Sequence, residues 1–174
     1  MTQRKDPARA IRGRVSRAVG LDLEERLDAY HATLTDAHVR RVGTPHRVVG
    51  KPARGVFKVA MTGHQGCDFA GWVRLSPASL PMPVVLEAKT HDGFDAWSMQ
   101  AIDEHQRAEL HAYAAAGCLA LVVLEAWGSV WLFEWARLSG HRAARSRWTV
   151  RPDEAETLGR RLSGVAWWEA EVWP

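Results

Sequence analysis

The sequence contains no asparagine and little cysteine, tyrosine or lysine: 2 Cys, 2 Tyr and only 4 Lys among 23 basic residues. Cys67 and Cys118 stand alone, without a CxxC pair, so neither a disulfide framework nor a cysteine zinc site is expected. We expect two buried free thiols instead. The histidines also lack the HExxH pattern of one large class of zinc enzymes.

Long apolar runs are absent as well. The longest, at 119–124 and 130–133, are far shorter than the roughly 20 residues that a membrane span requires. The first residues are basic and polar, unlike the apolar core of a signal peptide. We therefore expect a protein that has no membrane segment and works in the cytoplasm.

What is present is an ordinary globular composition with a basic bias. The chain has 174 residues, 47% of them hydrophobic and 25% charged, with a formal charge of +3. Of the basic residues 19 are Arg, the side chain that binds phosphate in a bidentate manner. Residues 1–18 have little to bury and predict a basic arm, flexible when free, with Arg9, Arg12, Arg14 and Arg17. Residues 19–174 then form a single domain.

The hydrophobic pattern predicts an α/β fold. Leu23, Leu27 and Leu34 recur at helical spacing, and a second long helix is expected over 102–116. Strands are expected in 39–60, interrupted at 43–45 and 51–55, and at 67–73, 84–89, 118–127 and 129–135, the last two joined by a turn at Gly128–Ser129. Residues 90–100 are predicted to form a loop, and a short helix is expected to begin at Pro152 and end near Leu162. The expected order is α-β-β-β-β-α-β-β with a small C-terminal helix, a mixed sheet flanked by helices.

Basic residues follow the β-like segment 39–60. They predict a phosphate-binding surface there, and a third basic cluster lies at 141–147. The residues expected to contact DNA in the segment 39–60 are Arg40, Arg41, Arg47, Lys51, Arg54 and Lys58.

The residues that carry chemistry lie in and before the strand at 84–89. Side chains alternate along a strand, so Glu87 and Lys89 share one face while Leu86 and Ala88 share the other. An acid and an amine in an apolar strand need to be paired or to hold a metal. Asp68 lies 19 positions earlier, in a segment that can return alongside Glu87. Two carboxylates and a lysine at one place predict a Mg²⁺ site that leaves room for a substrate phosphate.

Four short motifs then resemble a known family. Residues 23–27 (LEERL), 68–71 (DFAG), 87–90 (EAKT) and 104–106 (EHQ) are similar, in order and approximate spacing, to those of RecU-type Holliday junction resolvases, which have LEExI-like, DYxG, FEAKE and HEHQ segments. The resemblance spans roughly residues 20–135. Cys67 departs from the family, which usually has Pro or Thr before the aspartate.

The resemblance implies a restriction-endonuclease-like fold of the PD-(D/E)XK superfamily. It implies that Asp68 and Glu87 bind Mg²⁺, for which Mn²⁺ can substitute, and that Glu24 adds a carboxylate directly or through water. Gln106 would orient a water or a ligand of the metal, and Lys89 would neutralise charge on the phosphate. The protein would be a homodimer that cuts four-way DNA junctions in a bacterial or phage-infected cell, leaving 5′-phosphate and 3′-hydroxyl ends. The segment 39–60 would form a short basic stalk.

Other interpretations of the same residues stay open. Another PD-(D/E)XK nuclease, acting on flaps, ends or restriction sites, would share the site, and a non-catalytic DNA-binding protein would use the basic surfaces alone. A ββα-metal nuclease needs an Asn or a second His after its catalytic His, so the absence of Asn disfavours it. Glu25 is the alternative to Glu24, and His105 is an alternative catalytic residue. The nine Trp residues stack on bases or pack in the core.

Overall fold

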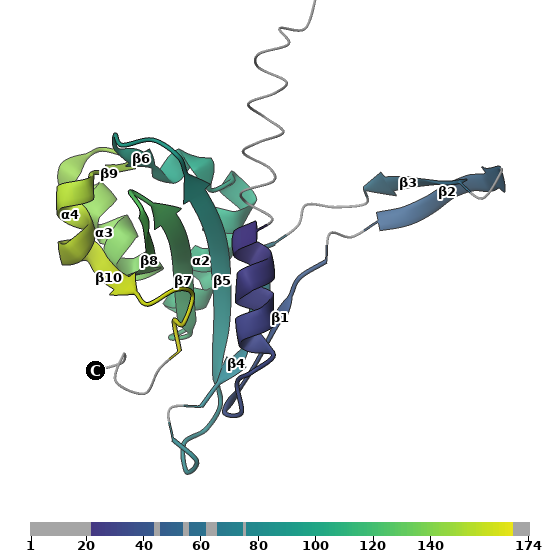
Figure 1. Ribbon diagram of the computed structural model, residues 1–174, viewed down its shortest axis with the longest axis horizontal. Coiled ribbons are helices and arrows are strands. Elements are labelled where there is room, and N and C mark those ends of the chain that lie inside the picture. Colours follow the sequence, from purple (N-terminus) through teal and green to yellow (C-terminus); the bar gives the residue numbers. More distant parts are fainter. Residues whose placement is uncertain (1–21, 44–45, 54–55, 62–65, 75, 169–174) are drawn as a thin grey trace, which may run out of the picture.

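A computed structural model describes residues 22–43, 46–53, 56–61, 66–74 and 76–168. The chain folds into a mixed α/β structure with a six-stranded mixed sheet flanked by helices (Figure 1). In spatial order its strands are β1 (Ala37–Arg41), β4 (Phe69–Val73), β5 (Met82–His91), β7 (Leu119–Ala126), β8 (Ser129–Glu134) and β10 (Gly159–Leu162). The arm residues Arg9, Arg12, Arg14 and Arg17 lie outside the described residues.

The connections give the sheet its mixed character. β1, β4 and β5 are antiparallel neighbours, whereas β5 and β7 are parallel and are joined through α2 (Glu104–Ala115). A parallel pair needs such a crossover, because the chain must return to the starting edge of the sheet. β7 and β8 form a hairpin, and β10 adds an antiparallel edge strand to β8.

Apolar side chains cover both faces of the sheet. On one face Val85 packs in a core with Leu110 of α2 and Leu138 of α3 (Trp135–Arg145), and α4 (Pro152–Leu158) joins the same layer. On the other face Leu86 packs with Leu23 of a helix over 22–31, referred to below as the first helix. The central strands are therefore buried on both sides, which explains their continuous runs of Val and Leu.

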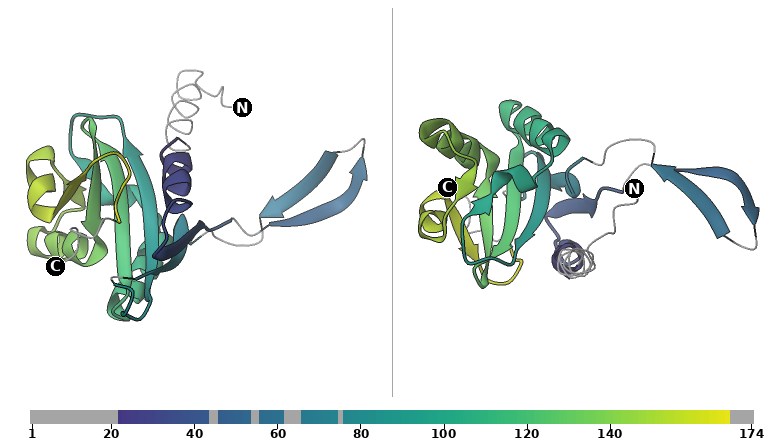
Figure 2. Two further views of the ribbon diagram at one scale, coloured as in Figure 1. Left: turned by 60° about the horizontal axis from the view of Figure 1, so that its bottom comes forward. Right: turned by 90° about the horizontal axis from the view of Figure 1, so that it is seen from above.

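A two-stranded hairpin stands apart from this body. β2 (His46–Ala53) and β3 (Val56–Met61) pair with each other and form a separate sheet. The hairpin extends away from the six-stranded sheet in all three views (Figures 1 and 2). Arg47, Lys51 and Lys58 lie on these strands, of which only the backbone is described, and Arg54 lies outside the described residues.

Several boundaries differ from the sequence expectation. β2 continues through Ala53, with a register shift after Val49 in the stretch where Pro52 lacks a backbone N–H. The turn between β7 and β8 is Trp127–Gly128, with φ of 53° and 70°, one residue before the predicted turn. Positive φ at both central residues is what a tight hairpin turn requires.

The expected loop and C-terminal helix also need correction. β5 extends to His91, and the expected loop over 90–100 contains β6 (Trp97–Ser98) and the beginning of a 3₁₀ turn, η1 (Met99–Ala101). β6 pairs with β9 (Thr149–Val150) in a small sheet of its own. The α3 helix was not expected, and the C-terminal helix ends at Leu158 because the next residues form β10. Cys67 is a buried free thiol as expected, whereas Cys118 is only half-buried.

None of the helices within the described ranges is both long and apolar enough to cross a membrane.

Candidate active site

Glu87 and Lys89 lie in the middle of the sheet, on the face covered by α2. Their strand, β5, is flanked by β4 and β7, and the Glu87 side chain is completely buried. Val85, two residues earlier, packs in the α2-side core, while Leu86 and Ala88 pack in the core on the opposite face. The alternation predicted from the sequence is therefore confirmed.

Asp68 lies beside Glu87. The register pairs Phe69 of β4 with Leu86, so the residue before β4 lies next to Glu87. The backbone N–H of Asp68 donates to Glu87 Oε2 at 3.3 Å, and Asp68 Oδ2 accepts from the backbone N–H of Ala88 at 2.8 Å. These contacts bring the two carboxylates together as predicted, although Asp68 precedes its strand rather than belonging to it.

Lys89 and Gln106 complete the buried polar cluster. The Lys89 ammonium donates to Glu87 Oε1 in a close ion pair, and it lies 3.4 Å from Gln106 Oε1. The same Gln106 oxygen accepts from the backbone N–H of Asp103 at 3.1 Å, just before α2. Gln106 Nε2 donates to the Gly66 carbonyl at 3.4 Å. Gln106 thus connects the start of α2, the lysine and the segment that leads to Asp68.

Glu109 has a role that the sequence did not suggest. Its Oε2 accepts from the backbone N–H of Cys67 at 2.7 Å, directly before Asp68. An added Cβ at Gly66 would lie 2.2 Å from the same carboxylate oxygen, so a larger residue there would displace the Glu109 side chain. Glu109 is three residues after Gln106, on the same side of α2, and this spacing is the signal that could have identified it.

Glu24 faces this cluster from the first helix, whereas Glu25 is exposed. Glu24 Oε2 pairs closely with the Arg41 guanidinium, at the end of β1. Arg40, also predicted to contact DNA, is exposed on the same strand. Arg41 therefore neutralises an acidic residue of the site, in addition to any contact with DNA.

Burial and neighbouring charges shift the pKa values of the cluster. Burial and the neighbouring Asp68 carboxylate raise the pKa of Glu87 to about 8, against the opposing effect of Lys89. Burial and the charge of Asp68 also raise the pKa of Glu24, while Arg41 and Lys89 act to lower it. Burial acts to lower the pKa of Lys89, but Glu87 outweighs this effect and the pKa is raised, so the lysine is an ammonium at neutral pH.

No family model and no curated protein matches the chain. The chemistry of the site is therefore the guide to what it can do. A buried ammonium with a high pKa suits the neutralisation of an anion better than the removal of a proton, because a general base must lose its proton near the working pH.

The donor set fits a divalent cation that retains most of its water. Within the described ranges, no three His, Cys, Asp or Glu side chains form a group that could hold a metal. Asp68 and Glu87 supply two carboxylates, and Mg²⁺ is commonly held by one or two carboxylates together with water and phosphate oxygens. A cation between them would offset the negative charge that raises the pKa of Glu87. That Glu24 is a further ligand stays a prediction.

The remaining candidates lie at the margin of the site. His105 is half-buried next to Gln106, and its side chain does not enter the hydrogen bonds described above. Trp131 and Trp135 are buried in the core on the α2 side, where packing was the favoured interpretation.

Proposed function

We propose that this protein is a Mg²⁺-dependent, structure-selective DNA endonuclease that resolves four-way junctions, related to the RecU-type resolvases. One observation carries the proposal. Asp68, Glu87 and Lys89 converge on one face of a central strand, linked by direct hydrogen bonds. Two buried carboxylates beside an ammonium are suited to holding a metal ion against a phosphodiester.

The arrangement of the elements supports a restriction-endonuclease-like assignment. The first helix is followed by three strands, β1, β4 and β5, each antiparallel to its neighbour in the sheet. The crossover helix α2 and the parallel strand β7 come next. The β2–β3 hairpin is an insertion between the first two of these strands. Similar folds host many functions, so the site and not the fold carries the argument.

Each residue of the cluster would have a separate role in phosphodiester hydrolysis. A bound Mg²⁺ supplies Lewis-acid polarisation of the phosphate under attack. Asp68 and Glu87 would hold it, and Lys89 would neutralise charge that develops on the phosphate oxygens. Gln106 and Glu87 hold the lysine in place. Water attacks in line, and the resemblance implies that the 3′ oxygen leaves, so the products carry a 5′-phosphate and a 3′-hydroxyl.

Recognition of a junction would be shared between two subunits. A four-way junction has near two-fold symmetry, so paired cuts on opposing strands call for two active sites related by a two-fold axis. The β2–β3 hairpin projects from the six-stranded sheet and has Arg47, Lys51 and Lys58 in its sequence. Both features support a role as a basic stalk. Together with the arm it would bind phosphates and recognise shape. We place the reaction in the cytoplasm of a bacterial or phage-infected cell.

The proposal is tested by cleavage of an immobile four-way junction, a linear duplex and a flap, with Mg²⁺, with Mn²⁺ or with chelator. We expect paired cuts in the junction that require metal. Glu87→Gln and Asp68→Asn should lower the cleavage rate roughly 100-fold or more and leave junction binding within a few-fold. Glu25→Gln, which changes an exposed acid of the first helix, is the matched control and should cut normally.

Three outcomes would contradict part or all of this proposal. Preferred cutting of the flap or the duplex would indicate another PD-(D/E)XK nuclease with the same site. Binding without any metal-dependent cutting would indicate a non-catalytic DNA-binding protein. Robust cutting by purified Glu87→Gln protein would remove the assigned site.

A further inference from the structure

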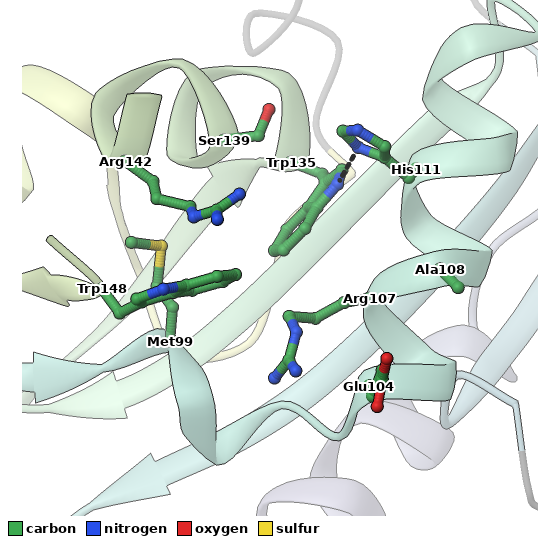
Figure 3. A pocket seen from close by; sticks show the side chains of 9 residues that line it. All are labelled: Met99, Glu104, Arg107, Ala108, His111, Trp135, Ser139, Arg142 and Trp148. Carbon is green, nitrogen blue, oxygen red and sulfur yellow. Dashed lines mark hydrogen bonds between the residues drawn. The ribbon is translucent and has the colours of Figure 1, made fainter. Parts of the chain in front are cut away.

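A cavity lies on the same side of the sheet as α2 and is separate from the candidate metal site. It has a volume of about 340 Å³ and is bordered by the facing sides of α2 and α3 and by the segment after α3 (Figure 3). This volume is in the range of small-molecule sites, which begins near 300 Å³. Met99, Trp135 and Trp148 contribute much of its wall, so its surface is largely apolar and aromatic.

Two arginines reach into this cavity and contact an aromatic ring, and Arg107 Nη1 also donates closely to the Ile102 carbonyl. The Arg142 guanidinium of α3 lies 3.8 Å from the centre of the Trp148 ring, and that of Arg107 of α2 lies 5.1 Å from it. Across the described part of the chain, neither guanidinium forms an ion pair with a carboxylate, whereas Arg41 and Arg147 both do. Cation–π contact uses the face of a guanidinium and leaves N–H groups at its edge free to bind an anion.

His111 lines the same cavity beside Trp135. The indole N–H of Trp135 donates to His111 Nδ1 at 2.9 Å, which places the hydrogen of the neutral imidazole on Nε2. Figure 3 shows this pair on one side of the cavity and Arg142 and Arg107 on the others. Among the described residues that line the cavity, only Glu104 carries a carboxylate, and Glu104 is exposed. The cavity therefore combines two guanidinium groups and a neutral histidine with an aromatic wall.

This combination selects a particular ligand chemistry. Guanidinium groups from two different helices suit a tetrahedral phosphate, whose oxygens point in several directions, better than a planar carboxylate with two. The cavity is much larger than a phosphate ion, and its apolar wall suits a flat ring attached to that phosphate. We propose that the cavity between α2 and α3 binds one nucleotide, with the phosphate on Arg107 and Arg142 and the base against the aromatic wall.

The nucleotide has two possible sources with the same chemistry. It is either a free mononucleotide or an unstacked nucleotide of a DNA strand. In the second case the inference rests on the proposed function. Gln106 faces the candidate metal site and its neighbour Arg107 lines the cavity, so the start of α2 would separate the bound nucleotide from the phosphate that is cut.

The test uses the full chain in chelator, so that the metal site takes no part. Calorimetric titration with deoxyadenosine 5′-monophosphate should show binding of one molecule per chain. Inorganic phosphate and deoxyadenosine should each bind at least about tenfold more weakly, because each supplies only half of the contacts. Arg142→Gln and Arg107→Gln should each weaken the mononucleotide about tenfold, as expected for lost charge-assisted hydrogen bonds. Arg137→Gln, an exposed arginine of α3 outside the cavity lining, is the matched control and should change binding less than twofold.

A 5′-phosphorylated single strand then separates the two sources. If DNA is the source, Arg142→Gln weakens strand binding about fivefold or more relative to Arg137→Gln, and the mononucleotide competes with the strand. If the free nucleotide is the source, strand binding is unchanged while mononucleotide binding is lost. Glu87→Gln should bind the mononucleotide like the wild type, so a failed nuclease assignment and a failed pocket assignment give different results. The inference would be overturned if the wild-type protein did not bind the mononucleotide. It would also be overturned if Arg142→Gln, Arg107→Gln and Arg137→Gln bound it equally well and unfolded at the same temperature.

Discussion

Glu87 carries an energetic cost in the folded protein, because its side chain is buried beside a second acid. Its carboxylate is fully buried next to Asp68, and the single ammonium of Lys89 serves both acids. Burial raises the pKa of Glu87 to about 8, with the charge of Asp68 as the next cause. Two neighbouring acids in the middle of a sheet support the cation site proposed above.

Metal binding should therefore appear as a gain in stability, independently of any cleavage. At ten times its Kd, Mg²⁺ should raise the Tm of the wild-type protein by about 3–6 °C, measured by thermal unfolding. Glu87→Gln removes one carboxylate of the proposed site and should lose this response. Its Tm in chelator should exceed that of the wild type, because a neutral amide avoids the cost of burying a carboxylate and the smaller repulsion with Asp68. Glu25→Gln should respond to Mg²⁺ like the wild type. An equal rise for the wild type and Glu87→Gln would show that the cation binds elsewhere.

The α2 helix acts as the positioning element for the loop that carries Asp68. Gln106 donates to the Gly66 carbonyl, and Glu109 accepts from the Cys67 N–H. Both contacts come from one side of the helix and hold the backbone immediately before the aspartate. Partners that orient a metal ligand typically change metal affinity or activity by roughly 10–100-fold when they are removed.

Glu109→Ala should accordingly weaken the apparent Mg²⁺ affinity by about tenfold, measured from the Mg²⁺ dependence of both cleavage and thermal unfolding. The expected mechanism is a freed Cys67 N–H and a less ordered Asp68. Glu109→Gln keeps an oxygen that can accept this hydrogen bond, so it should restore most of the affinity. Equal losses in both variants would mean that the charge of Glu109 matters and not its hydrogen bond.

These elements also show how far the sequence could predict the fold. β5, β7 and α2 were predictable because continuous Val and Leu runs mark strands buried on both faces, and a long segment rich in Ala, Glu and Leu favours a helix. α3 begins directly after β8, at Trp135, so no loop separates it from the strand that was expected to end there. β10 has two exposed arginines in four residues and is defined by pairing with β8, which local sequence does not encode.

The candidate site was predictable to a similar extent. Glu87 and Lys89 followed from alternation along one strand, and Asp68 from its position in the neighbouring segment. The cavity between α2 and α3 was not predicted, because it joins Arg107, Arg142 and Trp148 from segments that only tertiary packing brings together. The same holds for Glu109, whose partner is a backbone N–H and not another side chain.

The two ends of the described domain are tied together on the face opposite α2. Trp167, fully buried, donates its indole N–H to His31 Nε2 at 2.8 Å, and the Tyr30 hydroxyl donates to the Trp168 carbonyl at 2.7 Å. Both partners lie at the end of the first helix, which also carries Glu24. The C-terminal segment therefore helps to hold the helix that presents this carboxylate to the site, and loosening it should disturb the site as well as the core.

This connection makes stability depend on the protonation of His31. Burial lowers the pKa of His31 to about 4 from 6.5, an effect only partly offset by the charge of Asp28. In the folded state Nε2 accepts the Trp167 hydrogen bond, so a proton added there would face another donor. Between pH 6.5 and 4 the unfolded chain binds a proton that the folded protein excludes, so stability is complete above this window and falls as the pH decreases through it.

We expect a loss of about 2 kcal/mol in unfolding free energy from His31 between pH 7 and pH 5, measured by denaturant unfolding. His31→Gln does not titrate and retains an oxygen that can accept from Trp167. Between pH 7 and pH 5 its unfolding free energy should therefore fall by about 2 kcal/mol less than that of the wild type. His38→Gln changes an exposed histidine and should keep the pH dependence of the wild type. Parallel pH profiles for the wild type and His31→Gln would assign the acid sensitivity to other groups and leave the histidine as a packing residue alone.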